Sequence, residues 1–450
     1  SLIFGSPMRG AALAVGLAAA IGLAACGDDT VPPPSRTDLP YELYCDITNG
    51  DCQRTIYNSV AAKLGAAGLG LPRIRTISVE QHAEEMRRSV ALDELTGEDP
   101  YTRGLRLMGF IPEASESLTA TQLEFRINQI AAYYSGSDDM ITVVDRAYGE
   151  VDAQALLAHE FVHAIQERQF GFDGIWAAVD TEDAVLGARS VIEGDANHTE
   201  AAWVYEKLGY LPSEIDWDAI LDDSKERLGK RVDDPEVALV DTASFFPYSY
   251  GYAFMTELAL LYGLDGRADA FESPPRSAFE VMTGPLGARP ALGFPEVAHP
   301  APPQGHTQEV ENRFGAWYVY AFLRRSGLSE SEAWATALSW RGDEFAVYDN
   351  GSEVAAVWRV RFDEAASVVR DAVNADQEGR AQTAVLYEDD VFVLAAESGP
   401  SLLAWAEQPL DSMTAALVLK NGQRRGGPVS VGTCLKSLDF SLPNPPPLLH

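Results

Sequence analysis

The chain has 450 residues, of which 46% are hydrophobic and 22% are charged. This composition is typical of a globular protein with a substantial core, and the length allows one large domain or two to three smaller ones. Because 34 Lys and Arg stand against 67 Asp and Glu, the formal net charge is −33. A surface this acidic repels phosphate backbones, which excludes nucleic acid as a partner.

The N-terminal segment has the pattern of an export signal. Arg9 precedes an uncharged, largely apolar run that ends in Leu-Ala-Ala before Cys26, as in a secretory signal peptide. This ending resembles the bacterial lipobox, in which the cysteine is lipidated and becomes the mature N-terminus. We expect residues 1–26 to be a lipoprotein signal peptide and residues 27–40 a Pro-rich tether. The alternative is an ordinary signal peptide with an incidental cysteine.

These features predict where the protein is found. A lipid on Cys26 would anchor it to a membrane of the bacterial cell envelope, at the outer membrane or the periplasmic face rather than the inner membrane; release to the extracellular space is the other possibility. Disulfides persist in such compartments. Cys45 and Cys52 flank an Asn49-Gly50 turn signal, so we expect a bridge between them, with two free thiols as the alternative.

The body of the chain divides into three predicted regions. Residues 41–119 show helical spacing of apolar residues, and this spacing continues into residues 120–134. Two β-prone runs, 131–134 and 140–144, flank the segment Ser-Gly-Ser-Asp-Asp and predict a hairpin. Two long helices are expected at 152–170 and 181–209. The region 344–450 mixes short β-prone runs with helix and ends in a Pro-rich tail, so the fold class expected is α+β, predominantly helical.

The first of the two long helices carries a His-Glu-x-x-His motif. His159 and His163 lie about 40° apart and one turn along an α-helix, so both imidazoles can reach one ion. Glu160 is displaced by one residue, which lets its carboxylate reach a water on that ion without becoming a ligand. The alternative is two helix histidines with polar partners.

Two histidines do not complete a zinc site, so a third ligand is needed. The extended metzincin motif is excluded because Gln166 and Gln169 stand where it requires Gly and His. Glu193 follows His163 by thirty positions on the next predicted helix, and an antiparallel return of that helix would present its carboxylate to the ion. Asp195 and His198 are the alternative ligands.

These motifs resemble the gluzincin clan of zinc peptidases, in which a Glu-Gly-x-Ala motif often follows His-Glu-x-x-His. From Gln122 to Arg370 the chain also resembles a mostly uncharacterised family of bacterial lipoproteins of this type. The resemblance implies a zincin-like catalytic domain over 120–343, with a small sheet and hairpin before the active-site helix. It implies one Zn²⁺ held by His159, His163 and Glu193, with Glu160 as general base.

The resemblance also implies two supporting roles. In many gluzincins an acidic residue four positions after the ligand Glu supports the first histidine; here that position is Asn197, whose amide oxygen could accept from His159. An oxyanion donor often lies downstream, and Tyr248, Tyr250 and Tyr252 are the candidates, with Tyr250 first.

The function expected is therefore that of an exported, membrane-tethered zinc metallopeptidase. It would hydrolyse peptide bonds of a peptide or protein substrate through a zinc-bound water, with Glu160 as base. The hairpin would offer an edge strand to an extended peptide. Two alternatives stay open: a degenerate zincin that binds zinc or peptides in the envelope without turnover, and a lipoprotein whose function lies in its C-terminal region.

Overall fold

The computed structural model describes residues 45–90, 99–112, 118–145, 150–177, 179–287, 302–375, 382–387 and 390–406, together with a two-residue strand at Ala14–Val15. The rest of the predicted signal peptide, the predicted lipidation site Cys26, the predicted tether 27–40 and the Pro-rich tail lie outside the described residues. Within the described part, no helix combines the length and the apolar character needed to cross a bilayer.

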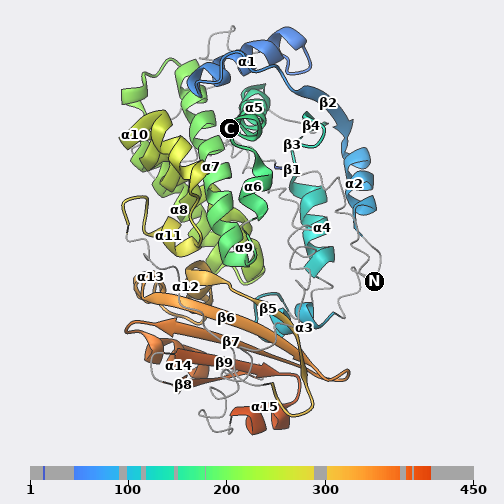
Figure 1. Cartoon of the computed structure of the whole chain (residues 1–450), viewed down its shortest axis with the longest axis vertical. Coiled ribbons are helices and arrows are strands. Elements are labelled where there is room, and N and C mark those ends of the chain that lie inside the picture. The colour runs from blue at the N-terminus through green and yellow to red at the C-terminus, as the bar shows by residue number, and fades with distance from the viewer. Residues whose placement is uncertain are drawn as a thin grey trace, which may run out of the picture.

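The fold is mixed α+β and mostly helical, as the sequence predicts. Figure 1 shows a helical part with a small sheet above a larger sheet. The helices of the upper part are α1 (Gly50–Lys63), α2 (Val79–Arg88), α4 (Leu118–Gln129), α5 (Glu150–Phe170), α6 (Phe172–Ala177), α7 (Glu182–Lys207), α8 (Trp217–Asp233), α9 (Leu239–Phe246), α10 (Tyr252–Glu272) and α11 (Ala278–Met282). Helix α3 (Pro100–Leu107) lies beside the larger sheet. A 3₁₀ turn spans Pro212–Glu214, and a π-helical turn at Pro247–Gly251 joins α9 to α10.

The small sheet has the strand order β1-β3-β4-β2. The predicted hairpin is confirmed: β3 (Ala132–Ser135) and β4 (Met140–Asp145) pair antiparallel. β2 (Arg73–Ser78) pairs parallel with β4, although the sequence predicts helix throughout this region. Six residues between two helical patterns are too short for the strand period to stand out. β1 (Ala14–Val15) pairs antiparallel with β3, on the edge opposite to β4.

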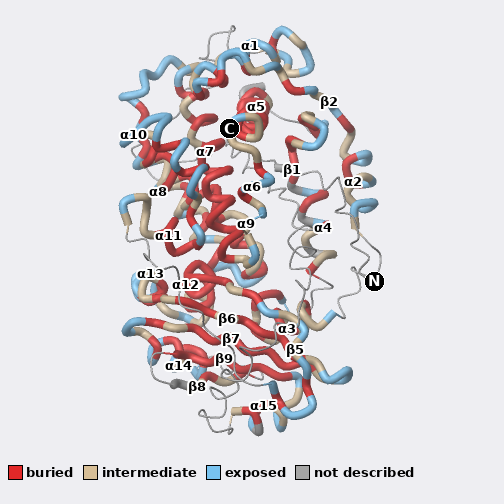
Figure 2. Tube along the Cα trace, in the orientation of Figure 1, coloured by how far each residue is buried: buried red, intermediate tan, exposed pale blue. Residues whose placement is uncertain are grey.

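Helices α5 and α7 form the centre of the upper part. Both match the helices predicted at 152–170 and 181–209. α7 begins at an N-cap, Thr181, whose side chain accepts from the backbone N–H of Ala184, which satisfies one of the free amides of the first turn. Most residues of α7 are buried, and Figure 2 shows it surrounded by other buried segments. Side chains on this pair of helices are therefore shielded from solvent.

The lower part is a five-stranded antiparallel sheet of order β5-β6-β7-β9-β8. Its strands are β5 (Thr307–Asn312), β6 (Trp340–Asp349), β7 (Val354–Phe362), β8 (Gln382–Tyr387) and β9 (Asp390–Ala396), and its helices are α12 (Gly315–Arg325), α13 (Glu330–Leu338), α14 (Ala366–Ala375) and α15 (Gly399–Ala406). Side chains from α3, α7, α12 and β7 share one hydrophobic core. Elements from all three predicted regions therefore pack together.

Two further sets of contacts connect separate elements of the structure. Cys45 and Cys52 form the predicted disulfide, which ties the start of the described body to α1. In the lower part, the buried carboxylate of Asp343 accepts hydrogen bonds from the backbone amides of Phe314 and Gly315 and from the indoles of Trp340 and Trp358. This joins the start of α12 to strands β6 and β7.

Candidate metal centre

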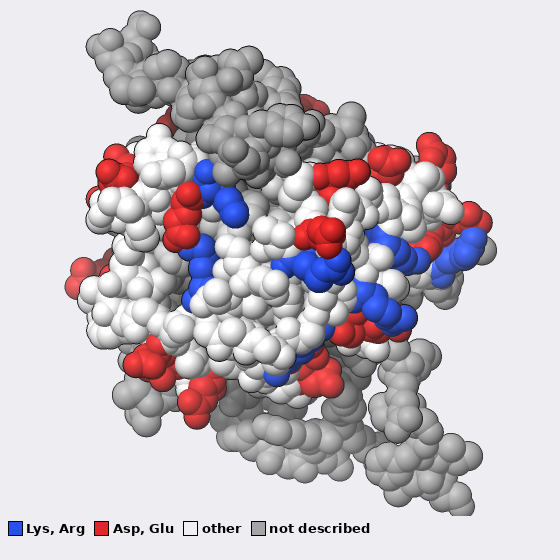
Figure 3. All heavy atoms as spheres, turned by 90° about the horizontal axis from the view of Figure 1, so that it is seen from above, with Lys and Arg blue, Asp and Glu red and all other residues white. Residues whose placement is uncertain are grey.

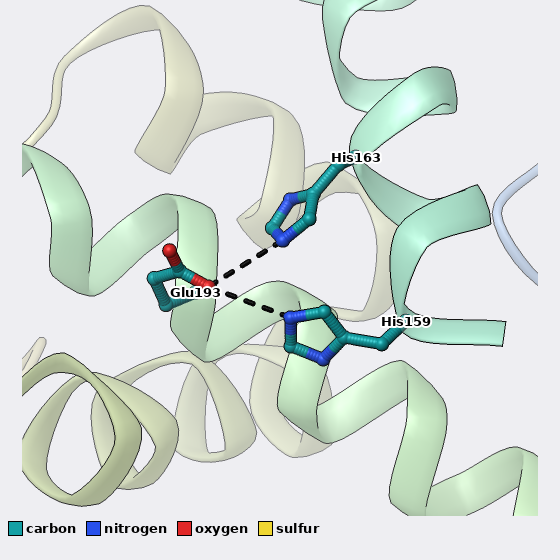
Figure 4. Close-up of side chains that lie close together, drawn as sticks. All are labelled: His159, His163 and Glu193. Atoms are coloured by element: carbon teal, nitrogen blue, oxygen red, sulfur yellow. Dashed lines mark ion pairs between the residues drawn. The ribbon is translucent and has the colours of Figure 1, made fainter. Parts of the chain in front are cut away.

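Three predicted site residues converge between α5 and α7. His159 and His163 project from successive turns of α5, and Glu193 projects from α7 toward both rings (Figure 4). Glu193 Oε2 lies 3.4 Å from Nε2 of His159 and 3.4 Å from Nε2 of His163. All three side chains are buried, and together they could hold a metal ion.

The glycine that follows Glu193 lets α7 approach the chain before α10. A Cβ on Gly194 would lie 2.1 Å from the carbonyl oxygen of Gly251, and a Cβ on Gly251 would lie 2.6 Å from Ser190 Cα. Neither position has room for a side chain. Glu193, which faces the two histidines, is therefore followed directly by the glycine at which α7 packs closely against the chain before α10.

His159 is oriented by a carboxylate that the sequence analysis missed. Its Nδ1 lies 3.0 Å from Oε2 of Glu200, a fully buried residue two turns beyond Glu193 on α7. The prediction that Asn197 supports His159 is wrong. Its side-chain amide donates instead to the backbone carbonyl of Tyr248, at 3.4 Å. A partner seven positions after Glu193 also lies on the same face of the helix, because seven residues make about two turns.

His163 is oriented by an amide network. Its Nδ1 lies 2.8 Å from Oε1 of Gln166, whose amide nitrogen donates to the carbonyl of Ile192 (2.9 Å) and to Asp195 Oδ2 (2.8 Å). Asp195 in turn is paired with the buried guanidinium of Arg267 at 2.9 Å. Gln166, which excludes the metzincin motif, therefore holds a metal-facing histidine in place.

These partners fix the protonation of both rings. Glu200 and the amide oxygen of Gln166 are acceptors, so each Nδ1 carries the proton and each Nε2 presents a lone pair. Burial lowers the pKa of His159 to about 4, so this ring is neutral near pH 7. Two lone pairs and a carboxylate oxygen thus face one another, and none of these three atoms has a hydrogen-bond partner among the described residues.

This donor set fits a cation. Acceptors that face one another without a donor repel, and a bound metal ion removes the conflict. Ligand atoms about 2.0–2.1 Å from a tetrahedral zinc are about 3.3–3.4 Å apart. The two distances of 3.4 Å between Glu193 and the rings match that separation.

Glu160 lies beside the three ligands but not among them. It is fully buried, and neither of its carboxylate oxygens has a hydrogen-bond partner in the described part of the chain. Burial, followed by the charge of Glu193, raises its pKa well above the usual value, while the backbone amide of Tyr134 on β3 opposes the rise. Its carboxylate therefore lies near both Glu193 and strand β3 of the small sheet.

The tyrosine at the site is Tyr248 rather than Tyr250. The Tyr248 ring lies parallel to that of His159, with centroids 6.5 Å apart, and no described residue binds its hydroxyl. Burial, then the charge of Glu193, raises its pKa well above the usual value. The Tyr250 ring instead stacks on Phe246 and Trp334. Both tyrosines lie in the π-helical turn. Because a π-helix has more residues per turn than the 3.6 of an α-helix, the α-helical period does not predict which side chains share a face there.

The two alternative ligands are used elsewhere. Asp195 is engaged with Arg267 and Gln166, as described above. Nδ1 of His198 lies 3.1 Å from the hydroxyl of Thr256, and its ring packs on Trp217 with centroids 4.7 Å apart. Neither belongs to the group of three that could hold the ion.

Comparisons with protein-family models, with curated proteins and with solved structures find no match for this chain. The residues and geometry of this molecule alone therefore carry its functional interpretation.

Proposed function

We propose that this protein is an exported zinc-dependent peptidase of zincin type, tethered to the bacterial envelope by a lipid on Cys26. The observation that carries the proposal is the convergence of His159, His163 and Glu193 with both Nε2 lone pairs directed at Glu193 Oε2. Three protein ligands with no fourth among the described residues leave a coordination position open, which is typical of catalytic rather than structural zinc.

Glu160 is the general base in this proposal. A zinc ion held by the three ligands supplies a Lewis acid for the scissile carbonyl and for water. The Glu160 carboxylate takes a proton from the attacking water and passes it to the leaving amine. Its position supports this role, because it is buried next to Glu193 and its oxygens have no other described partner to compete for that proton.

Tyr248 replaces Tyr250 as the proposed oxyanion donor. A donor must lie beside the metal ligands to reach the oxygen of the tetrahedral intermediate. The Tyr248 ring is parallel to that of His159, and its hydroxyl is protonated over the physiological range. Tyr250, packed among Phe246 and Trp334, is left with a structural role.

The edge of β3 that faces away from β4 is the proposed substrate-binding edge. β1 pairs antiparallel with Tyr134 and Ser135 on this edge, so the strand accepts an extended segment there. β1 belongs to the predicted signal peptide, whose removal would leave the edge unpaired. A substrate in its place would run past Glu160, which is close to the Tyr134 amide. Main-chain pairing gives affinity with little sequence choice.

The decisive experiment compares the chain from Gly27 to His450 with its Glu160→Gln variant on an unbiased peptide mixture. Cleavage products are identified by mass spectrometry, and bound zinc is measured in both proteins. We expect the variant to keep its zinc and lose peptide turnover by several orders of magnitude. His163→Ala should lose both, and a chelator should abolish native turnover reversibly. Turnover that persists in Glu160→Gln would contradict the assignment of the base.

A native protein that binds zinc without cleaving any peptide would favour the non-catalytic alternative. A degenerate zincin of this kind would keep the metal centre and the β3 edge as a binding surface. In that case Glu160→Gln would leave every measured property of the protein unchanged.

A further inference from the structure

Four exposed apolar side chains gather at one point of α10. Leu260, Leu261, Tyr262 and Leu264 are 61%, 50%, 52% and 47% exposed. Among the residues that the structure describes, only nine large apolar side chains are exposed to this degree, and four of them lie within these five positions. We call these four side chains the apolar apex. Single exposed leucines are ordinary, but a contiguous group marks an interaction site.

The apex protrudes, because α10 folds back on itself there. Gly263 has φ 60° and ψ −137°, which interrupts the helix. Thr256, before the turn, lies 3.1 Å from His198, and Arg267, after it, lies 2.9 Å from Asp195. Since the two contacted residues of α7 are three positions apart, both halves of α10 lie beside the same turn of α7. The segment between them therefore forms the tip of a helical hairpin.

The apex lies at the end of the molecule where the chain enters the described body. A Cβ on Gly65, two residues beyond α1, would lie 3.2 Å from Leu264 Cδ1, so the apex packs against the end of α1. α1 starts beside the Cys45–Cys52 disulfide and lies at the top of Figure 1. Its 14 residues span about 21 Å, so the start of the body lies about that far from the end of α1 that the apex contacts.

We propose that the apolar apex inserts into the lipid bilayer interface next to the N-terminal anchor. The inference relies on the tether of the proposed function but not on its catalytic part. Eighteen residues, 27–44, separate Cys26 from the described body. At about 3.1 Å per residue such a Pro-rich segment reaches roughly 56 Å, so a lipid on Cys26 and the apex can meet the same membrane. The tether raises the local lipid concentration, so weak insertion suffices.

Shape and charge favour a bilayer over a protein partner. The apex is convex and consists of leucines and a tyrosine, which are residues that enter the boundary between headgroups and acyl chains. Viewed from the α1 end, Lys and Arg side chains are interspersed with Asp and Glu over the visible surface (Figure 3). Although the net charge of the chain is −33, this face carries basic side chains that can meet anionic headgroups.

The test uses the chain from Gly27 to His450, which lacks the lipid, and vesicles of phosphatidylethanolamine with a minority of phosphatidylglycerol. Binding is measured by flotation over a range of lipid concentrations. The test variant carries Leu260→Ser and Leu261→Ser. The matched control carries Leu286→Ser and Leu403→Ser, two leucines that are 67% and 64% exposed outside the apex. Thermal unfolding of both variants is measured to check that they fold.

We expect each apex leucine to contribute about tenfold to vesicle partitioning, so the test variant should bind about 100-fold more weakly while the control binds as the native chain does. Peptide turnover should be equal in all three proteins, which separates this inference from the proposed function. No binding of the native chain, or equal binding of both variants, would overturn it. A change in oligomeric state of the test variant without a change in vesicle binding would also overturn it, and would assign the apex to contacts between copies.

Discussion

Replacing Glu200 by Gln should weaken zinc binding without changing the shape of the site. The side chain is fully buried and accepts from His159 Nδ1 at 3.0 Å, so no water screens the interaction. Gln keeps the length and an acceptor oxygen but removes the negative charge that increases the basicity of the ring. Loss of such a partner weakens metal affinity by about 10- to 100-fold, which corresponds to about 1.4–2.8 kcal/mol.

The assay is competition for zinc with a chromophoric chelator, using metal-free protein from Gly27 to His450. Glu206→Gln is the matched control, since Glu206 lies on the same helix but is 39% exposed and pairs with Lys63. It should leave zinc affinity unchanged within about twofold, because exposed pairs contribute little. Asn197→Ala should also have a small effect. A native affinity in Glu200→Gln, or a larger loss in Asn197→Ala, would refute the assigned orientation of His159.

Three further predictions follow from other parts of the structure. Tyr248→Phe should lower kcat by about 10²- to 10³-fold at unchanged zinc content, whereas Tyr250→Phe should not, as steady-state kinetics on any cleaved peptide would show. Burial raises the pKa of Asp241 to about 6 from 3.8, so its protonation favours the folded state, and this contribution to stability is lost as pH rises from about 4 to about 6. Urea unfolding should therefore show that Asp241→Asn gains stability relative to the native chain over that range. A difference in the free energy of unfolding that stays constant with pH would refute this. Replacing Cys45 and Cys52 by Ser should reduce the free energy of unfolding by about 2–3 kcal/mol, the loop-closure term for a separation of seven residues, measured by urea unfolding under non-reducing conditions.

Local periodicity in the sequence was sufficient to find the two histidines of the group that could hold a metal ion. Two histidines four positions apart share a helix face wherever the segment is helical, and no Pro interrupts α5. The Glu-Gly pair on the next helix then identified Glu193. The hairpin, the disulfide and strands β7, β8 and β9 of the larger sheet followed from turn residues and short β-prone runs in the same way. Strands β5 and β6 of that sheet were not predicted. β2 was missed because its pairing with β4 is parallel and connects segments more than sixty residues apart.

The supporting residues depended on tertiary packing. Whether Asn197 or Glu200 reaches His159 is set by how α7 packs against α5. The π-helical turn Pro247–Gly251 places Tyr248 at the site and Tyr250 against the core. The sequence by itself thus determined which groups can bind an ion, because their spacing is a property of one helix. Only the tertiary structure decided which groups orient them, because that choice depends on distances between helices.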